Sequence, residues 1–279
     1  MKLDVLKIAA FSDGEHGGNP AGVWIGDALP DASTMQSLAA EIGYSETVFA
    51  APVDSAWRVR YFSPESEVPF CGHATIALGA ALAMAHGDGQ FQLLLNHTSI
   101  TVEGARQGAL IAAALQSPPT HSEVADEALL ASVLALFGLQ KDDLDLRIPP
   151  AVAHGGATHV VLALKDREKL RAMHYDLDAG RRLMNDAGLV TILLAWVETN
   201  QLFHTRNPFA SGGVYEDPAT GAATAAFAGY LRSIGWPHGG RINIIQGEDM
   251  GSRSLLQADI SAQEGGSIRV SGTARIIES

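Results

Sequence analysis

The first half of the chain combines short apolar runs with one amphipathic segment. Residues 3–11, 47–50 and 57–62 are rich in apolar, β-branched and aromatic residues and predict strands. Residues 31–42 have apolar positions at helical spacing, start at an acidic N-cap candidate and are followed by Gly43 as a stop signal. This half is therefore expected to mix strands with helices.

The second half continues the mixture. A helix is predicted over residues 125–137, and the charged stretch 165–187 also has helical character. Strands are predicted over residues 158–164 and over the strongly apolar run 189–197. Residues 206–209, Arg-Asn-Pro-Phe, are interpreted as a turn.

One sequence pattern occurs twice, in residues 67–82 and again in residues 216–231. The shared residues, at a constant offset, are Glu67/Glu216, Pro69/Pro218, Gly72/Gly221, Ala74/Ala223, Thr75/Thr224, Ala77/Ala226 and Leu82/Leu231. Each copy predicts a strand that turns at a proline and a glycine into a helix of small apolar residues. The helices at 74–85 and 222–231 should be buried on every side, because neither shows a polar stripe.

The repeat indicates two copies of one lobe. We expect a first lobe over residues 1–117, joined by a C-terminal strand at 266–279, and a second lobe over residues 118–265. Pro118-Pro119 marks the boundary, since a proline pair interrupts regular structure. A ligand site is expected in the cleft between the two helix starts.

Composition narrows the class of protein. The chain has 279 residues, 47% of them hydrophobic, which is enough for two medium cores. A net charge of −12 without a basic cluster argues against a nucleic-acid partner. The longest apolar run is too short to cross a membrane, the N-terminus does not read as a signal peptide, and a lone cysteine suits a reducing compartment. A cytoplasmic protein with no membrane partner is expected.

Three residues are candidates for acid/base chemistry. Glu46 lies between a predicted helix and an apolar strand, where partial burial would raise the pKa of its carboxyl group, although a solvent-facing strand position is the alternative. His73 could relay a proton or serve as a polar residue at a helix start. Asp217 could hold substrate or act as an N-cap.

The other catalytic schemes have less support. Cys71 could act as a thiolate base at a helix start, but its counterpart in the second repeat is Thr220, so a pair of thiols is missing. The chain has no Gly-x-Ser-x-Gly motif. No metal site is predicted, because only His154 and His159 are closely spaced.

Five segments together resemble the PhzF-like family, the phenazine-biosynthesis F-type isomerases of the diaminopimelate epimerase-like fold. They are residues 18–22 (Gly-Asn-Pro-Ala-Gly), 44–49 (Tyr-Ser-Glu-Thr-Val-Phe), 60–64 (Arg-Tyr-Phe-Ser-Pro), 69–75 (Pro-Phe-Cys-Gly-His-Ala-Thr) and 216–221 (Glu-Asp-Pro-Ala-Thr-Gly). The resemblance implies an α+β fold of two pseudo-symmetric lobes. Each lobe would be a curled, mostly antiparallel sheet around a central helix, and neither cofactor nor metal would be needed.

The resemblance also implies roles for individual residues. Glu46 matches the family's acid/base glutamate, and His73 and Asp217 match residues that assist proton movement and hold the substrate. The predicted substrate-binding residues are Asn19, Cys71, Gly72, Thr220 and Gly221, with the N–H groups near the two glycines receiving a carboxylate. A homodimer is expected because dimers are common in that family.

The leading hypothesis is therefore an isomerase that moves a proton between carbons of a small carboxylate-bearing, amino-acid-like or dihydroaromatic substrate, with Glu46 as the proton carrier. A racemase, epimerase or dehydratase that uses Cys71 as the base is the first alternative. A non-catalytic small-molecule binding protein with the same fold is the second.

Overall fold

A computed structural model describes residues 4–277 of the chain, which divide into two units. Of these residues, the first unit contains 4–116, Arg253–Leu255 and 270–277, and the second contains Ser117–Ser252 and Leu256–Arg269. The predicted ends of the first lobe at residues 1–3 and 278–279 lie outside the described residues. No helix within residues 4–277 has the length and apolar character needed to cross a membrane.

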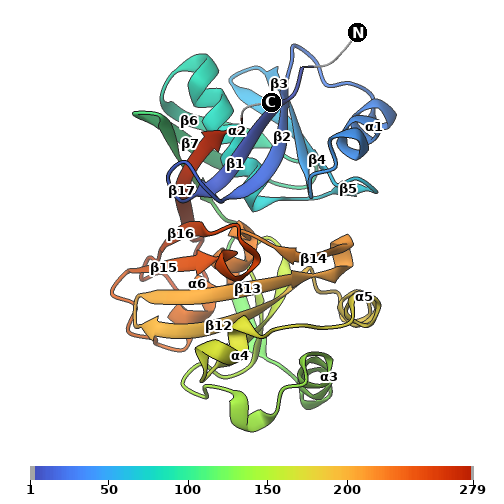
Figure 1. Cartoon of the computed structure of the whole chain (residues 1–279). Coiled ribbons are helices and arrows are strands. Elements are labelled where there is room, and N and C mark those ends of the chain that lie inside the picture. Colours follow the sequence, from blue (N-terminus) through green and yellow to red (C-terminus); the bar gives the residue numbers. More distant parts are fainter. Residues whose placement is uncertain (1–3, 278–279) are drawn as a thin grey trace. The chain divides into compact units, whose positions relative to one another are not determined.

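The first unit is a mixed, mostly antiparallel sheet with two helices. Its strands are β1 (Leu6–Ser12), β2 (Asn19–Ile25), β3 (Thr47–Val53), β4 (Ala56–Phe62), β5 (Glu67–Val68), β6 (Gly89–Leu94), β7 (Ser99–Gln107), β8 (Leu110–Gln116) and β17 (Arg269–Ile276). Its helices are α1 (Ala32–Ile42) and α2 (Gly72–His86). β1 pairs antiparallel with both β2 and β17, so the last strand of the chain lies beside the first, red against blue in Figure 1. Only the β2–β3 and β4–β6 pairs are parallel among the pairings described in this unit.

Helix α2 is the core of the first unit. It is buried from Gly72 to Ala83 and packs against β1, β2, β3, β6, β7 and β8, which curl around it (Figure 1). Small residues make this possible, because a Cβ atom on Gly104 of β7 would lie 2.3 Å from the Gly79 carbonyl oxygen of α2. The helix and the sheet therefore approach more closely than side chains would allow.

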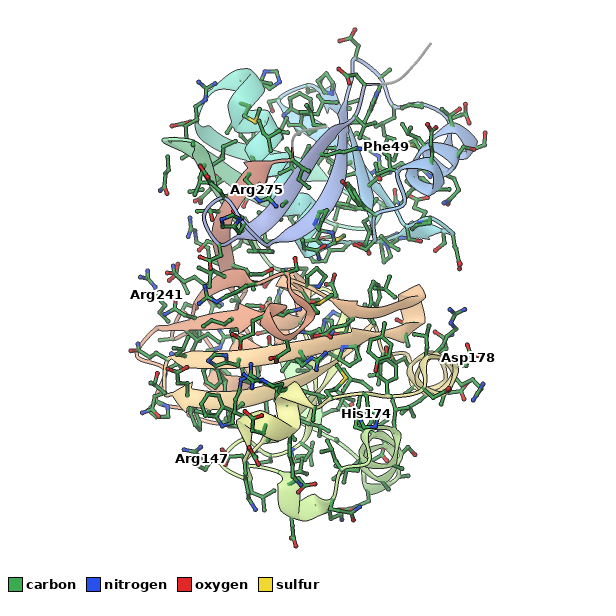
Figure 2. The ribbon with its side chains drawn as sticks, viewed as in Figure 1. Phe49, Arg147, His174, Asp178, Arg241 and Arg275 are labelled. Carbon is green, nitrogen blue, oxygen red and sulfur yellow. The ribbon has the colours of Figure 1, made fainter. Side chains whose placement is uncertain are left out.

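Helix α1 covers the outer face of the same sheet. Asp31 caps its first turn by accepting a hydrogen bond from the Thr34 N–H, and Gly43 ends it in the left-handed conformation. Its buried Met35 packs into a cluster with Phe49, which Figure 2 labels beside the helix. Residues 43–46 then connect α1 to β3.

The second unit has its own sheet and central helix. Its strands are β9 (His121–Val124), β10 (Ala151–His154), β11 (Thr158–Leu164), β12 (Thr191–Thr199), β13 (Leu202–Phe209), β14 (Val214–Asp217) and β15 (Arg241–Gln246), and β16 (Ser254–Asp259) begins in the first unit and ends in the second. Its helices are α3 (Glu127–Phe137), α4 (Arg167–Arg171), α5 (Leu177–Asp186) and α6 (Gly221–Ser233), with short 3₁₀ turns at η1 (Lys141–Asp143), η2 (Ala210–Gly212) and η3 (Glu248–Met250).

Helix α6 plays the part in this unit that α2 plays in the first. It is buried from Gly221 to Leu231 and packs against β9, β10 and β11. A Cβ atom on Gly155 would lie 2.6 Å from the Ala226 backbone nitrogen, so a close approach again requires glycine. Helices α3, α4 and α5 contribute to a separate apolar cluster with the other face of β11 and β12.

These elements confirm the predicted α+β class and most of the predicted segments. Two interpretations were wrong. Residues 206–209 are not a turn but the end of β13, where Pro208 lies beyond the last pair with β12 and at a register shift with β14. The stretch 165–187 is two helices, because Asp166 caps α4 and Asp176 starts a new helix by capping α5.

Candidate active site

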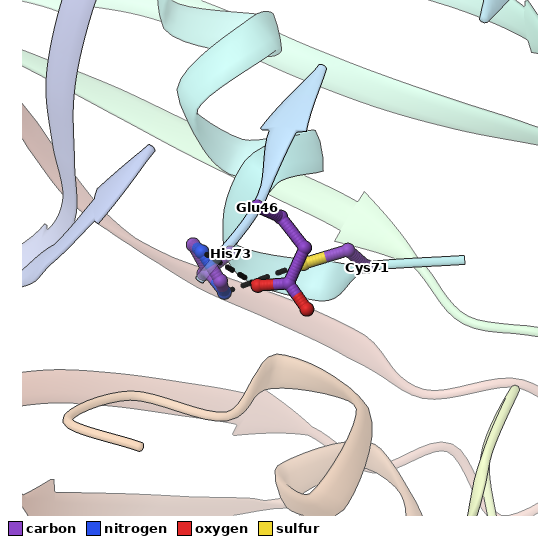
Figure 3. A group of neighbouring side chains, drawn as sticks. All are labelled: Glu46, Cys71 and His73. Atoms are coloured by element: carbon purple, nitrogen blue, oxygen red, sulfur yellow. Dashed lines mark hydrogen bonds and ion pairs between the residues drawn. The ribbon is translucent and has the colours of Figure 1, made fainter. Parts of the chain in front are cut away.

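Three side chains of the first unit meet at the start of α2. Glu46 lies in the connection between α1 and β3, while Cys71 is the N-cap residue of α2 and His73 belongs to its first turn. Glu46 Oε2 lies 3.5 Å from His73 Nε2, and Cys71 Sγ lies 3.3 Å from His73 Nδ1 (Figure 3). The fold thus brings together three of the predicted site residues from two separate segments.

The carboxyl group of Glu46 is set up for proton transfer near neutral pH. Glu46 is only 5% exposed, and burial raises the pKa of its carboxyl group from 4.5 to about 7, against the opposing effect of hydrogen bonds with Ser45 and Cys71. Its Oε2 atom is buried and has no hydrogen-bond partner. A carboxylate in this state can accept a proton from a bound molecule and return it.

His73 remains a neutral imidazole in the same pocket. Burial lowers its pKa from 6.5 to about 3, and its Nε2 atom lies 3.4 Å from the Ser45 hydroxyl oxygen. The contact with Glu46 is therefore that of an uncharged ring beside a carboxyl group rather than a salt bridge. A neutral ring can donate at one nitrogen and accept at the other.

A chain of hydrogen bonds holds the helix start in place. The Thr75 hydroxyl donates to the Cys71 carbonyl oxygen at 2.7 Å, so the Tyr61 hydroxyl, also at 2.7 Å, must be the donor to Thr75. Tyr61 lies on β4 and is fully buried. Ser45, Tyr61 and Thr75 were not predicted as site residues, since their contacts with the site form only in the fold.

The second unit carries a related arrangement at the start of α6. Thr220 is the N-cap residue, in the position that Cys71 has in α2, and Gly221 begins the helix as Gly72 begins α2. The Thr220 hydroxyl donates to Asp217 Oδ2 at 2.6 Å. Thr220, and not Asp217, is the N-cap residue of α6, and the Asp217 carboxylate is a hydrogen-bond acceptor beside it.

The side chain of Gln246 on β15 forms hydrogen bonds with two residues at the start of α6. Its Nε2 group donates to the Asp217 carbonyl oxygen at 2.7 Å and to the Thr220 hydroxyl at 3.0 Å, and its Oε1 accepts from the Thr220 N–H at 3.2 Å. Its side chain is completely buried. Gln246 was not predicted as a site residue, because it lies 26 residues from Thr220 in a strand that was not predicted either.

In each unit, an arginine–glutamate ion pair joins the two strands that precede the central helix. Arg206 of β13 forms a two-point ion pair with Glu216 of β14, with Nε to Oε1 at 2.9 Å, and both side chains are at least nine-tenths buried. Arg60 of β4 pairs with Glu67 of β5 in the same way but is about a quarter exposed. The repeated glutamates of the sequence pattern are thus the acidic partners of buried and half-buried arginines.

The remaining predicted residue, Asn19, also belongs to the first unit. It begins β2, is 1% exposed and pairs in register with Ala10 of β1. The predicted residues therefore form one group in the first unit, Glu46 with Cys71 and His73, and a second group in the second unit, Asp217 with Thr220.

Comparison with known proteins gives a family match over nearly the whole chain. A family model described as "Phenazine biosynthesis-like protein" (PhzC-PhzF) matches residues 8–279. The uncharacterized isomerase YddE of Escherichia coli K12 is 30% identical over 290 residues, which cover 99% of this chain and 97% of that protein. The trans-2,3-dihydro-3-hydroxyanthranilate isomerase of Pseudomonas fluorescens is 31% identical over 275 residues, covering 95% and 94%.

The fold has a counterpart among solved structures. A predicted epimerase from Pseudomonas aeruginosa superposes with a TM-score of 0.87 at 24% sequence identity, covering 99% of this chain and 98% of that one. At that level of identity the match concerns the fold, and it confirms the predicted epimerase-like architecture.

Proposed function

The chain belongs to the phenazine biosynthesis-like family and is an isomerase, and from that premise we propose that it moves a proton between carbons of a small carboxylate-bearing substrate with Glu46 as the proton carrier. The comparisons confirm the isomerase class, which fits both the leading hypothesis and a racemase or epimerase, and they do not support a non-catalytic binding protein. Amino-acid-like and dihydroaromatic acids are the proposed substrate class.

The state of Glu46 is the observation that carries this proposal. A buried carboxyl group with a pKa of about 7 is ionised in part of the molecules at neutral pH and protonated in the rest, so one group can serve as base and as acid. Its unpartnered Oε2 atom supplies the lone pair for the proton. An ordinary surface glutamate has neither property.

The proposed step conserves atoms and electrons. Glu46 takes a proton from a carbon next to the double bond of the substrate, and the electron pair of that C–H bond moves into the π system. The protonated Glu46 then delivers the proton to another carbon of the same system. The double bonds shift, nothing is oxidised or reduced, and the enzyme returns to its starting state.

The other predicted residues are proposed to hold the substrate. A helix start has N–H groups without partners inside the helix, and glycine at the first position leaves them open, as at Gly72 and Gly221. His73, Asp217 and Thr220 offer polar side chains beside these starts. We propose that the substrate carboxylate binds N–H groups of a helix start and that His73 assists the proton transfer.

The variant Glu46→Gln tests the proposal, because it keeps the shape and removes the base. The assay follows deuterium from solvent into candidate acids by NMR, starting with trans-2,3-dihydro-3-hydroxyanthranilate, which appears in the names of two relatives. Exchange and turnover should disappear in this variant and persist in Glu41→Gln, which changes an exposed glutamate of α1. Full activity of Glu46→Gln would contradict the assignment.

A Cys71-based racemase or epimerase remains the second candidate, since the Cys71 sulfur lies only 3.3 Å from a ring nitrogen of His73. The same exchange assay separates the two. If Cys71→Ala loses exchange while Glu46→Gln keeps it, the thiol is the base. If only Glu46→Gln is inactive, the carboxylate is.

The setting in the cell is also part of the proposal. We propose that the enzyme acts in the cytoplasm as a homodimer on a small-molecule substrate and has no nucleic-acid or membrane partner. Its single cysteine and its net charge of −12 support this setting. Sedimentation of the purified chain measures the oligomeric state directly.

A further inference from the structure

The three clustered side chains of the first unit are also three classes of metal ligand. Glu46, Cys71 and His73 offer a carboxylate oxygen, a sulfur and an imidazole nitrogen that all lie within 4.8 Å of one another. We propose that this cluster binds Zn²⁺, or another divalent cation that favours sulfur, as an inhibitory ligand of the proton-transfer site.

The separations between the ligand atoms fit one ion. Zinc binds sulfur at about 2.3 Å and nitrogen or oxygen at about 2.0–2.2 Å, and tetrahedral geometry then places ligand atoms roughly 3–4 Å apart. The Cys71 sulfur lies 3.3 Å from one ring nitrogen of His73, and Glu46 Oε2 lies 3.5 Å from the other. An ion takes only one of the two nitrogens, so the longest separation in the set, which is within 4.8 Å, must shorten when the ion binds.

The unpartnered oxygen of Glu46 is the independent sign of a ligand. A buried polar atom without a hydrogen bond is costly, and Glu46 Oε2 is such an atom in a residue that is 5% exposed. A cation bound there would satisfy it. Three protein ligands leave a fourth position of the ion for water.

This set of three ligand types is found at the start of α2 and nowhere else among residues 4–277. Among residues 4–277, no other group of three metal-binding side chains meets the same distance criterion. Another cluster of possible ligands surrounds His204, whose Nε2 lies 2.6 Å from Glu198 Oε2 and whose Nδ1 lies 2.5 Å from Glu248 Oε1. Both ring nitrogens of His204 are occupied by carboxylates, and that cluster has no thiol.

The bound ion would block turnover by holding the electron pair that Glu46 needs for the proton. This consequence depends on the proposed function, whereas metal binding does not. The two are therefore measured separately, binding by spectroscopy without substrate and inhibition by the deuterium-exchange assay.

Cobalt(II) is the probe for binding, because a cobalt–thiolate bond gives a charge-transfer absorption that nitrogen and oxygen ligands do not give. The 279-residue chain has a single cysteine, so any such band in the reduced protein reports Cys71. Titration should give the band at one equivalent of Co²⁺, and an equivalent of Zn²⁺ should remove it. This part of the test uses the unaltered protein.

Three variants test the ligand set. Cys71→Ser should abolish the band, while Glu46→Gln and His73→Gln should each weaken Co²⁺ affinity by at least about 100-fold, beyond the 10–100-fold typical of groups behind the ligands. His204→Gln is the matched control and should bind as the unaltered chain does. Circular dichroism checks that each variant is folded.

Several outcomes would overturn the inference. A missing charge-transfer band, or a band whose affinity is unchanged in both Glu46→Gln and His73→Gln, would mean that no three-ligand site exists. Loss of binding in His204→Gln would move the site to the second unit. If cobalt binds as expected but Glu46→Gln still turns over, the metal site stands and the proposed function fails.

Discussion

Replacing Glu46 by glutamine should stabilise the protein, and more so at higher pH. The folded state raises the pKa of the Glu46 carboxyl group from 4.5 to about 7, so the folded protein holds this proton more tightly than the unfolded chain. Below about pH 4.5 the Glu46 carboxyl group is protonated in both the folded and the unfolded state, so burying it costs little free energy. Between about pH 4.5 and 7 the unfolded chain releases this proton while the folded state keeps it, so stability falls over this interval and levels off above about pH 7.

The size of the effect follows from the two pKa values. Each pKa unit corresponds to about 1.4 kcal/mol, so the rise from 4.5 to about 7 destabilises the folded enzyme by about 3 kcal/mol above pH 7. At about pH 5 the destabilisation is only about 1 kcal/mol. Glutamine is neutral at every pH and avoids this effect.

Urea denaturation followed by circular dichroism measures the difference. The free energy of unfolding of Glu46→Gln should exceed that of the unaltered chain by about 2 kcal/mol more at about pH 8 than at about pH 5. Glu41→Gln, at an exposed position of α1, should change it by less than about 0.5 kcal/mol at both values. A Glu46→Gln difference that is the same at both pH values would refute a raised pKa.

Three further predictions follow from other contacts. Deuterium exchange, followed by NMR, should increase as pH rises through about 7, because only the ionised Glu46 accepts a proton; a flat profile between about pH 5 and 9 would argue against it. Tyr61→Phe should lower the free energy of unfolding by about 1 kcal/mol in urea, since Thr75 loses its donor, and no loss would mean that this hydrogen bond is unimportant. Arg206→Met should lower it by about 3–5 kcal/mol because it leaves a buried carboxylate unpaired. Arg60→Met, at a more exposed pair, should cost no more than about 1 kcal/mol, and equal losses would contradict the role of burial.

Local signals made the elements predictable. Helix α1 begins after Asp31 and ends before Gly43, as predicted. The Asp31 side chain caps the first turn, and Gly43 adopts the left-handed conformation that ends the helix. Both signals act within a few residues, so the sequence alone reveals them. The absence of a polar stripe predicted that the helix bodies are buried, as they are from Gly72 to Ala83 in α2 and from Gly221 to Leu231 in α6. Residues 206–209 were misread because pairing with β12 and β14 outweighs the local turn preference of Asn-Pro.

Long-range contacts account for what the sequence did not reveal. Glu46 could be suspected from its place between a helix and a strand, yet its contact with His73 depends on how β3 lies against α2. Gln246 carries no motif, and only the position of β15 beside β13 brings it to Thr220. The order of the motifs along the sequence was therefore enough to name the catalytic candidates. The distances between their side chains could be obtained only from the folded structure.

The pairing of β17 with β1 has a consequence for synthesis on the ribosome. Ile8 faces Ile276, and the Ile277 N–H donates to the Lys7 carbonyl oxygen at 2.8 Å. Translation delivers β17 after strands β1–β16 of the described residues, so this edge of β1 is unpaired while those strands are made. Unpaired edges are templates for strands of other molecules. The nascent enzyme is thus open to aggregation until its final segment emerges, and chaperone protection would matter most in that interval.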